Sequence, residues 1–222
     1  MEAMRSEDQL SLRDGLGLWS EKVTDVKDWS AGKRALFLDR DGVIVEHIPY
    51  LHDPDKTKLI AGSTEIIRSC NKRKIPVVLV TNQSGIGRGM YDWQDFVKVQ
   101  TRLMDLLGES GASVDMVLAC AYHPDVDGEY KKVDHSWRKP GGGMISEAER
   151  VLQLDLSGSW IIGDKDTDME AGMEAGLAGG VLVLSGETSQ TAADSVAGSS
   201  DFRLRKAYSI AACRFLVDYM SQ

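Results

Sequence analysis

Short apolar runs alternate along the chain with longer segments in which apolar residues recur every three or four positions. Runs of about four to eight residues are typical of buried strands, and the periodic segments are typical of helices that cover a sheet. The pattern predicts strands at residues 35–38, 76–80, 113–119, 159–162 and 180–184. It predicts helices at residues 63–72, 93–107, 144–152, 169–175 and 208–219. We therefore expect a doubly wound α/β fold with a mainly parallel, Rossmann-like sheet and helices on both faces.

The beginning of the chain does not follow this alternation. We expect residues 1–30 to form an arm that packs on the core, and residues 31–222 to form a single domain. Trp19 and Trp29 are the largest apolar side chains of the arm. They are expected to dock on the domain, because leaving two tryptophans in water is costly. A segment rich in Ser, Thr, Ala and Gly, residues 185–200, is predicted to be a loop with a short helical turn.

Composition and charge narrow the classes of function. The net charge of −8 disfavours nucleic acid as a partner, because a phosphate backbone binds basic surfaces. No apolar run is long enough to span a membrane, and the polar N-terminus lacks the core of a signal peptide. Cys70, Cys120 and Cys213 are far apart and give no disulfide framework. We therefore expect a cytoplasmic monomer or small homo-oligomer with no nucleic-acid or membrane partner.

Polar residues follow four of the predicted elements. They are Asp39-Arg40-Asp41-Gly42, Thr81-Asn82-Gln83-Ser84-Gly85, Arg138-Lys139-Pro140 and Gly163-Asp164-Lys165-Asp166-Thr167-Asp168. Because the carboxyl ends of parallel strands meet at one edge of a sheet, these groups can converge. Taken alone, the acids could be solvated strand ends or the first turn of a helix. Four such motifs together favour a catalytic site.

The residue types in these motifs suit phosphoryl transfer. Asp39 can attack phosphorus as a nucleophile, and Asp41 can protonate the leaving alcohol and then activate water. Asp39, Asp164 and the backbone carbonyl of Asp41 can hold Mg²⁺, which prefers oxygen ligands. Thr81 and the neighbouring amides can bind phosphate oxygens, and Lys139 can neutralise the charge that develops during transfer.

In order and spacing, these motifs resemble the motif set of the haloacid dehalogenase (HAD) superfamily of phosphatases, over residues 34–186. More narrowly, they resemble its branch of D-glycero-D-manno-heptose 1,7-bisphosphate phosphatases and histidinol-phosphatases. The resemblance implies a Mg²⁺-dependent phosphomonoesterase without a large cap domain. It would act on a small phosphorylated metabolite of carbohydrate metabolism, such as the heptose bisphosphate, through an aspartyl-phosphate intermediate. Histidinol phosphate is the alternative substrate. A non-catalytic binding protein that retains the fold is the alternative from a different class.

The resemblance implies a role for each matching residue. The implied catalytic residues are Asp39, Asp41, Thr81 and Lys139. The implied substrate-binding residues are His47, Tyr50, Asn82, Gln83, Ser84, Arg138 and Lys165. The implied Mg²⁺ ligands are Asp39, Asp164 and, through its backbone carbonyl, Asp41. Asp168 is expected to be a secondary ligand or to support the others.

One loop departs from the family pattern. Many members hold Zn²⁺ with Cys-x-His and then Cys-x-Cys just before Arg-Lys-Pro. This chain keeps Cys120, but Tyr122, His135 and Trp137 occupy the other positions. Tyr and Trp are not ordinary ligands of structural zinc, so we expect no Zn²⁺. The loop should instead be held by packing of Tyr122, Tyr130 and Trp137. The alternative is zinc held by Cys120, His123 and His135 with one carboxylate.

Overall fold

The computed structural model describes residues 10–23, 31–186 and 197–221. In these residues seven strands form one sheet, in the order β1-β4-β3-β2-β5-β6-β7. The strands are β1 (Leu18–Lys22), β2 (Leu36–Leu38), β3 (Val77–Asn82), β4 (Met116–Cys120), β5 (Trp160–Gly163), β6 (Gly179–Val183) and β7 (Arg203–Ala207). Strand β1 runs antiparallel to β4, and all other neighbouring strands are parallel.

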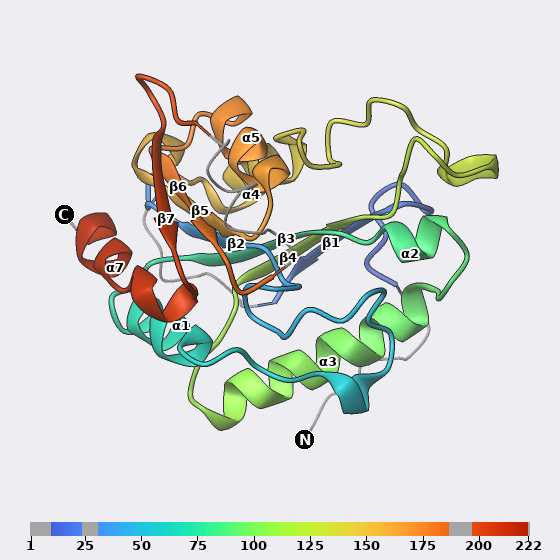
Figure 1. Cartoon of the computed structure of the whole chain (residues 1–222), viewed down its shortest axis with the longest axis horizontal. Coiled ribbons are helices and arrows are strands. Elements are labelled where there is room, and N and C mark those ends of the chain that lie inside the picture. Colours follow the sequence, from blue (N-terminus) through green and yellow to red (C-terminus); the bar gives the residue numbers. More distant parts are fainter. Residues whose placement is uncertain (1–9, 24–30, 187–196, 222) are drawn as a thin grey trace.

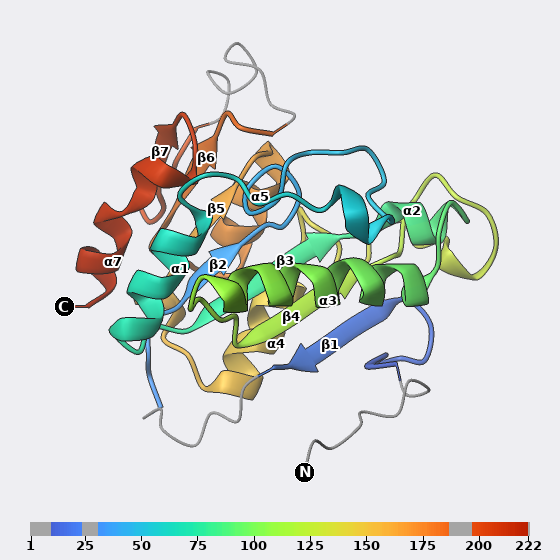
Figure 2. The ribbon, with the colours of Figure 1, turned by 90° about the horizontal axis from the view of Figure 1, so that it is seen from below.

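Helices connect the parallel strands and cover both faces of the sheet. The α-helices are α1 (Ser63–Lys72), α2 (Ser84–Gly87), α3 (Trp93–Glu109), α4 (Gly143–Leu152), α5 (Asp166–Glu174) and α7 (Phe215–Met220). The 3-10 helices are η1 (Pro54–Lys56), η2 (Gly128–Tyr130), η3 (Leu156–Gly158) and η4 (Ile210–Cys213). Helices α1 and α3 lie on one face, and α4 and α5 lie on the other (Figures 1 and 2). The predicted doubly wound α/β fold is confirmed.

Two apolar cores lie between the sheet and these helices. Leu36 and Leu38 of β2 belong to the core under α1 and α3, whereas Phe37 belongs to the core under α4 and α5. All three side chains are fully buried. A strand buried on both faces reads as a continuous apolar run, which is why the sequence shows this strand clearly. None of the helices in the described ranges is long and apolar enough to cross a membrane.

Helix α3 shows why the helical predictions succeed. It begins at a capping box, in which the Asp92 carboxylate accepts hydrogen bonds from the N–H groups of Gln94 and Asp95. The Asp95 carboxylate accepts a hydrogen bond from the N–H of Asp92 in return. Phe96 and Leu103 then recur at helical spacing, and both are fully buried against the sheet.

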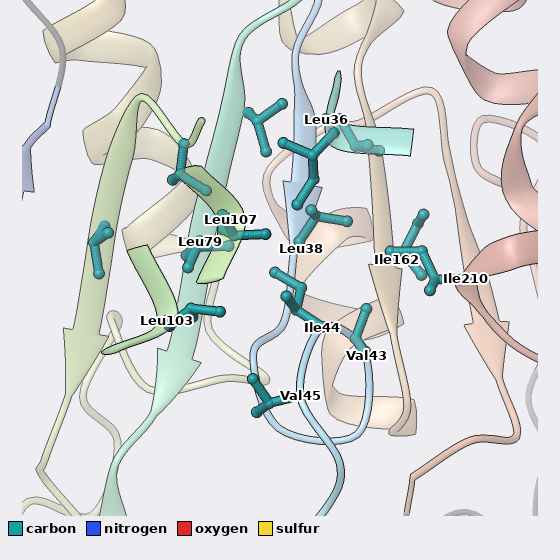
Figure 3. Packing of buried hydrophobic residues seen from close by; sticks show 14 of the residues in the cluster. Leu36, Leu38, Val43, Ile44, Val45, Leu79, Leu103, Leu107, Ile162 and Ile210 are labelled. Atoms are coloured by element: carbon teal, nitrogen blue, oxygen red, sulfur yellow. The ribbon is translucent and has the colours of Figure 1, made fainter. Parts of the chain in front are cut away.

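The turn after β2 is anchored by the residues that follow it. Val43, Ile44 and Val45 are fully buried and lie beside Leu38 in the core (Figure 3). Gly42 has a φ of +84°, which favours glycine, and its N–H donates to the carbonyl of Val45 at 2.8 Å. The backbone that carries the two acids of the Asp-Arg-Asp-Gly motif is thereby held rigidly.

The structure differs from the prediction at the C-terminal end. Residues 208–219 are not one helix, because η4 and α7 are separate and Arg214 lies between them. Strand β7 was not predicted, because three of its five residues are Arg or Lys and no apolar run marks it. Charged side chains are typical of an edge strand, where they oppose pairing with another chain. The other predicted strands and helices are confirmed, with shifts of a few residues at their ends.

Part of the N-terminal arm joins the sheet. Strand β1 pairs with β4 as an edge strand, which the sequence did not predict. The Trp19 ring lies 5.7 Å from the Trp93 ring and 5.3 Å from the Phe96 ring, so this tryptophan docks on α3 as expected. Trp29 and most of the predicted loop at residues 185–200 lie outside the described residues. The division of the chain at residue 30 stays a prediction.

Candidate active site

The ends of β2 and β5 bring the predicted acids to one edge of the sheet. Asp39 follows β2, Asp164 follows β5, and Asp168 joins them from the first turn of α5. Oxygen atoms of these three buried carboxylates lie within 4.8 Å of one another. No other trio of His, Cys, Asp or Glu side chains in the described ranges is close enough to hold a metal ion. Carboxylate oxygens are the ligands that Mg²⁺ prefers.

Two glycines pack closely around the Asp164 carboxylate. A Cβ atom on Gly42 would lie 2.8 Å from Asp164 Oδ2 and 2.7 Å from the Cα of Gly186. A Cβ atom on Gly186 would overlap with the same carboxylate oxygen. The Ser185 hydroxyl also donates to the carbonyl of Gly42 at 2.8 Å and so ties the two turns together. This packing fixes the Asp164 side chain beside Asp39.

Lys139 lies between two of the acids. Its Nζ atom is 2.7 Å from Asp39 Oδ1 and 2.6 Å from Asp168 Oδ1, and it donates to the carbonyl of Val80 at 2.9 Å. Burial alone would lower the pKa of Lys139, but the two carboxylates outweigh it and raise the pKa. The Asn82 side chain exchanges hydrogen bonds of 3.0 and 3.1 Å with the backbone of Lys139 and holds it in place.

The acids of the site carry more negative charge than Lys139 balances. Burial raises the pKa of the Asp39 carboxyl to about 8; Lys139 opposes this effect, whereas Asp168, Asp164 and Asp41 add to it. A cation bound among these carboxylates would favour their charged forms and lower the pKa of Asp39 again. The residues therefore fit a divalent metal ion in both ligand type and charge.

Asp41 is paired with Arg40 and does not belong to the trio of acids. The Nε and Nη2 atoms of Arg40 donate to both Asp41 oxygens at distances from 2.9 to 3.2 Å. Arg40 is only 1% exposed, and its guanidinium lies 5.5 Å from the centre of the Phe96 ring. The Asp41 side chain is 23% exposed and lines the cavity above the site. It is thus a fixed carboxylate that a substrate can reach.

Gln83 joins this ion pair to Thr81. Its Nε2 atom donates to Thr81 Oγ1 at 2.8 Å and to Asp41 Oδ2 at 3.3 Å. Its Oε1 atom accepts from the Tyr91 hydroxyl at 2.6 Å and from Arg40 at 3.2 Å. Because the Thr81 oxygen accepts a hydrogen bond here, its own O–H remains a donor that could bind a phosphate oxygen.

A cavity of about 350 Å³ opens over these groups. The predicted site residues that line it are Asp39, Asp41, His47, Tyr50, Asn82, Gln83, Ser84, Lys139 and Lys165. Thr81, Asp164 and Arg138 are not part of the lining. Thr81 and Asp164 are buried, and Arg138 donates to the carbonyl of Tyr122 at 3.1 Å. The role of Arg138 as a substrate-binding residue stays a prediction.

Two residues of the site have contacts that the sequence does not predict. Arg40 was read only as part of a motif, although a cation between two acids is a signal for an ion pair. Tyr91 lies between α2 and α3, and nothing in the sequence near it indicates that its hydroxyl reaches Gln83. Asp168 was expected to be a secondary metal ligand or to support the other ligands. In the structure its carboxylate contacts Lys139 as closely as that of Asp39 does.

The loop that departs from the family pattern is held by aromatic packing, as predicted. Cys120, Tyr122 and Trp137 belong to the same buried core. The Tyr122 ring lies 6.3 Å from the Tyr130 ring and stacks on the His135 ring at 4.7 Å. These contacts hold the loop between β4 and α4.

The alternative zinc ligands are not gathered around one point. Cys120, His123 and His135 form no metal-binding group among the residues that the structure describes. The Nδ1 atom of His123 accepts a hydrogen bond from the N–H of Asp125, and the Nδ1 atom of His135 accepts one from Trp137. The absence of zinc itself stays a prediction.

Comparison with known proteins places this site in a family. A family model described as HAD-hydrolase-like matches residues 136–206. A D-glycero-beta-D-manno-heptose-1,7-bisphosphate 7-phosphatase from Mesorhizobium japonicum is 47% identical over 167 residues, which make up 75% of this chain and 76% of that protein. The chain belongs to the HAD-like phosphatases. A second HAD-like relative of the same name, from Photorhabdus laumondii, is 40% identical over 75% of this chain and 88% of its own length.

Solved structures of HAD-like phosphatases share the fold. One from Mesorhizobium loti has a TM-score of 0.85 and 40% identity, and the match covers 96% of this chain and 97% of that chain. The D,D-heptose 1,7-bisphosphate phosphatase from B. bronchiseptica, complexed with magnesium and phosphate, has a TM-score of 0.71 and 29% identity. That match covers 82% of this chain and 96% of the other. The chain is therefore an α/β phosphatase of the HAD-like family, an enzyme that hydrolyses phosphomonoesters.

Proposed function

We propose that this HAD-like phosphatase uses Mg²⁺ to hydrolyse the 7-phosphate of D-glycero-D-manno-heptose 1,7-bisphosphate. The observation that carries the proposal is the buried group of Asp39, Asp164, Asp168 and Lys139 beside a cavity of about 350 Å³. Relatives that bear the name of this activity are 47% and 40% identical. The D,D-heptose 1,7-bisphosphate phosphatase from B. bronchiseptica was solved with magnesium and phosphate.

Asp39, Asp164 and the backbone carbonyl of Asp41 would hold the metal ion. Bound there, Mg²⁺ would shield the Asp39 carboxylate from the charge of the phosphate that it must attack. Asp168 lies within the same group of carboxylates and also fixes the start of α5, because its Oδ2 accepts from the N–H of Lys165 at 3.0 Å. Its second task is to hold the ammonium group of Lys139.

The reaction would proceed in two transfers. An Asp39 oxygen attacks phosphorus while Asp41 gives its proton to the leaving alkoxide, which yields an aspartyl phosphate and a free alcohol. Asp41, now a carboxylate, takes a proton from water as that water attacks the same phosphorus. Inorganic phosphate leaves and Asp39 is regenerated. The Lys139 ammonium group donates to the attacking carboxylate of Asp39. It would neutralise charge on the phosphoryl oxygens, and Thr81 would donate a further hydrogen bond to them.

The outer part of the cavity would bind the rest of the substrate. His47 and Tyr50 line it from the segment after β2, Ser84 from the start of α2, and Lys165 from the turn before α5. A bisphosphate carries two anionic groups, and the two lysines of the lining supply positive charge to a protein that is acidic as a whole. Arg138 would bind the substrate from the loop between β4 and α4.

We place the enzyme in the cytoplasm as a monomer or small homo-oligomer. Cys70, Cys120 and Cys213 are all buried and unpaired, which suits a reducing compartment. The phosphorylated metabolite would be its partner, without nucleic acid or membrane.

The proposal is tested by assaying purified protein against both anomers of the heptose bisphosphate, histidinol phosphate and an aryl phosphate, with and without Mg²⁺. We expect release of the 7-phosphate from the heptose, dependence on Mg²⁺, and no turnover by Asp39→Asn. ³¹P NMR identifies which phosphate is lost. Hydrolysis of histidinol phosphate in preference to both heptose anomers would overturn the proposed substrate, and activity that survives Asp39→Asn would overturn the mechanism.

A further inference from the structure

The Gln83 side chain uses its whole capacity for hydrogen bonds. A carboxamide has two N–H donors and two oxygen lone pairs. Both donors are directed at groups of the reaction, Thr81 Oγ1 at 2.8 Å and Asp41 Oδ2 at 3.3 Å. The oxygen accepts from Tyr91 and Arg40. With 2% exposure, Gln83 acts mainly as a link between other side chains, although one edge of it lines the cavity.

Arg40 permits only one orientation of this amide. A guanidinium is a donor only, so it can face the Gln83 oxygen but not the Gln83 nitrogen. A reversed amide would set two donors against each other at the 3.2 Å contact with Arg40. The Gln83 N–H groups must therefore point toward Thr81 and Asp41. It follows that the Tyr91 hydroxyl donates to Gln83 Oε1 and does not accept from it.

Two further contacts hold the Tyr91 ring. A Cβ atom on Gly85 would overlap with the Tyr91 ring, so the ring packs directly on the backbone at the start of α2. The His52 ring stacks on Tyr91 with centres 5.8 Å apart and an interplanar angle of 15°. Tyr91 is 8% exposed, and burial raises the pKa of its hydroxyl, so the donor proton is retained in neutral solution. A rigid donor thus supports a rigid amide.

We propose that Tyr91, through Gln83, is a positioning residue that holds the Asp41 carboxyl in line with the leaving oxygen. The inference rests on the proposed function, because it concerns the proton transfer of the first step. Asp41 has two oxygens, and the Gln83 N–H contacts Oδ2. Arg40 donates to both oxygens, whereas Gln83 donates to Oδ2 alone, so Oδ1 is the oxygen better placed to carry the proton to the leaving group. The proton passes from Asp41 to the leaving alkoxide as the P–O bond breaks and the bond from Asp39 to phosphorus forms, so Asp41 gains the negative charge that Asp39 loses.

The consequence can be measured with a series of aryl phosphates of similar shape but different leaving-group basicity. A nitrophenolate leaves with little help, whereas an unsubstituted phenolate depends more on protonation. The value of kcat/KM covers the steps up to the first phosphoryl transfer. Loss of proton donation therefore steepens the plot of log(kcat/KM) against leaving-group pKa. A change in folding or general packing lowers all points equally.

Tyr91→Phe removes one hydroxyl with little change in shape. We expect it to lower kcat/KM about tenfold for phenyl phosphate and less than about twofold for p-nitrophenyl phosphate, a fraction of the usual contribution of a general acid. Asp41→Asn should steepen the plot further. Tyr91→Phe added to Asp41→Asn should change nothing more, because both act on the same proton transfer. Tyr208→Phe, at a tyrosine that is 83% exposed, is the control and should match the wild type.

Three results would overturn the inference: parallel plots for Tyr91→Phe and the wild type, wild-type rates in Tyr91→Phe, or a further loss when Tyr91→Phe is added to Asp41→Asn. These results differ from a failure of the proposed function. In that case the wild type would hydrolyse neither the aryl phosphates nor the heptose bisphosphate, or its activity would survive Asp39→Asn.

Discussion

The ammonium nitrogen of Lys139 lies 2.7 Å from Asp39 Oδ1, and both side chains are more than nine-tenths buried. A buried carboxylate and a buried ammonium are each expensive alone, and each is tolerated because the other is present. Together with a bound cation, Lys139 favours the charged form of the nucleophile Asp39, whose pKa burial raises. The ammonium group of Lys139 also lies where negative charge develops on the phosphoryl oxygens during transfer.

Lys139→Met should therefore affect both catalysis and stability. We expect kcat to fall by about 10² to 10³, as when other preorganised charge-stabilising donors are removed. Without Mg²⁺, the free energy of unfolding should fall by about 3 to 5 kcal/mol, because two buried carboxylates lose their partner. Mg²⁺ should restore part of this loss. Urea unfolding with and without Mg²⁺ measures both effects.

The matched control for that substitution is Lys98→Met. Lys98 forms an exposed ion pair of 2.9 Å with Asp95, and such pairs contribute little to stability. An equal loss of stability in the two variants would show that burial does not set the strength of the Lys139 contacts.

Gly42→Ala should weaken metal binding. The new Cβ would lie 2.8 Å from Asp164 Oδ2 at a backbone φ of +84°, so either the carboxylate or the turn must move. We expect the dissociation constant for Mg²⁺ to rise by more than about tenfold, measured by calorimetric titration, if the moved ligand costs about 1.4 kcal/mol. Gly111→Ala has a similar φ of +66° with no atom within 4 Å of the new Cβ. This control variant should lose stability through backbone strain alone, and its affinity for Mg²⁺ should be unchanged.

The binding of Mg²⁺ should strengthen as pH rises from 6 to 9. The pKa of Asp39 is raised to about 8 in the folded protein, so the folded state holds a proton that the unfolded state releases near pH 4. This group therefore stabilises the metal-free protein at low pH, and that contribution is lost as pH rises through 8. Because the proton and the cation compete, the Mg²⁺ dissociation constant should fall by up to about tenfold per pH unit below 8.

The check is the rise in melting temperature caused by a fixed Mg²⁺ concentration, which should be larger at pH 9 than at pH 6. Asp39→Asn has no titrating group at this position and should show a weaker dependence on pH. A rise that is independent of pH in the wild type would contradict the assignment of Asp39 as a ligand.

The N-terminal arm should restrain the loop between β4 and α4. Asp14 accepts hydrogen bonds from the N–H groups of the turn before β1, and its Oδ2 accepts from the Tyr122 hydroxyl at 2.5 Å. Tyr122→Phe removes only this tie. If the bond contributes about 1 kcal/mol at this partly exposed position, trypsin should cut after Lys131 or Lys132 about fivefold faster. Hydrolysis of a small aryl phosphate should change less than about twofold. Cleavage at the wild-type rate would show that packing alone holds the loop.

The buried part of the fold could be predicted from sequence because burial leaves a pattern. Strand β3 and helix α1 have apolar residues at the spacings that a two-sided strand and an amphipathic helix require. Edge strands carry no such pattern. In β7 the exposed side chains of Arg203, Arg205 and Lys206 conceal the strand, and β1 is defined chiefly by its pairing with β4.

The site, like the fold, has parts that the sequence pattern predicts and parts that it does not. Asp39 and Asp164 could be placed because each follows a predicted strand, so the topology brings them together. The link from Tyr91 to Asp41 could not be predicted, because it depends on the rotamer of Gln83 and on a turn that brings the ring over Gly85. Such contacts follow from packing in three dimensions and leave no periodic signal.

A nucleophilic Asp39 carries a covalent phosphoryl group during turnover, and this intermediate can be trapped. The enzyme is mixed with the heptose bisphosphate and Mg²⁺, quenched in acid within milliseconds, digested and examined by mass spectrometry. We predict one phosphoryl group on the peptide that contains Asp39, and none on the corresponding peptide of Asp39→Asn. Turnover with no phosphoryl group on this peptide, or turnover by Asp39→Asn, would show that Asp39 is not the nucleophile.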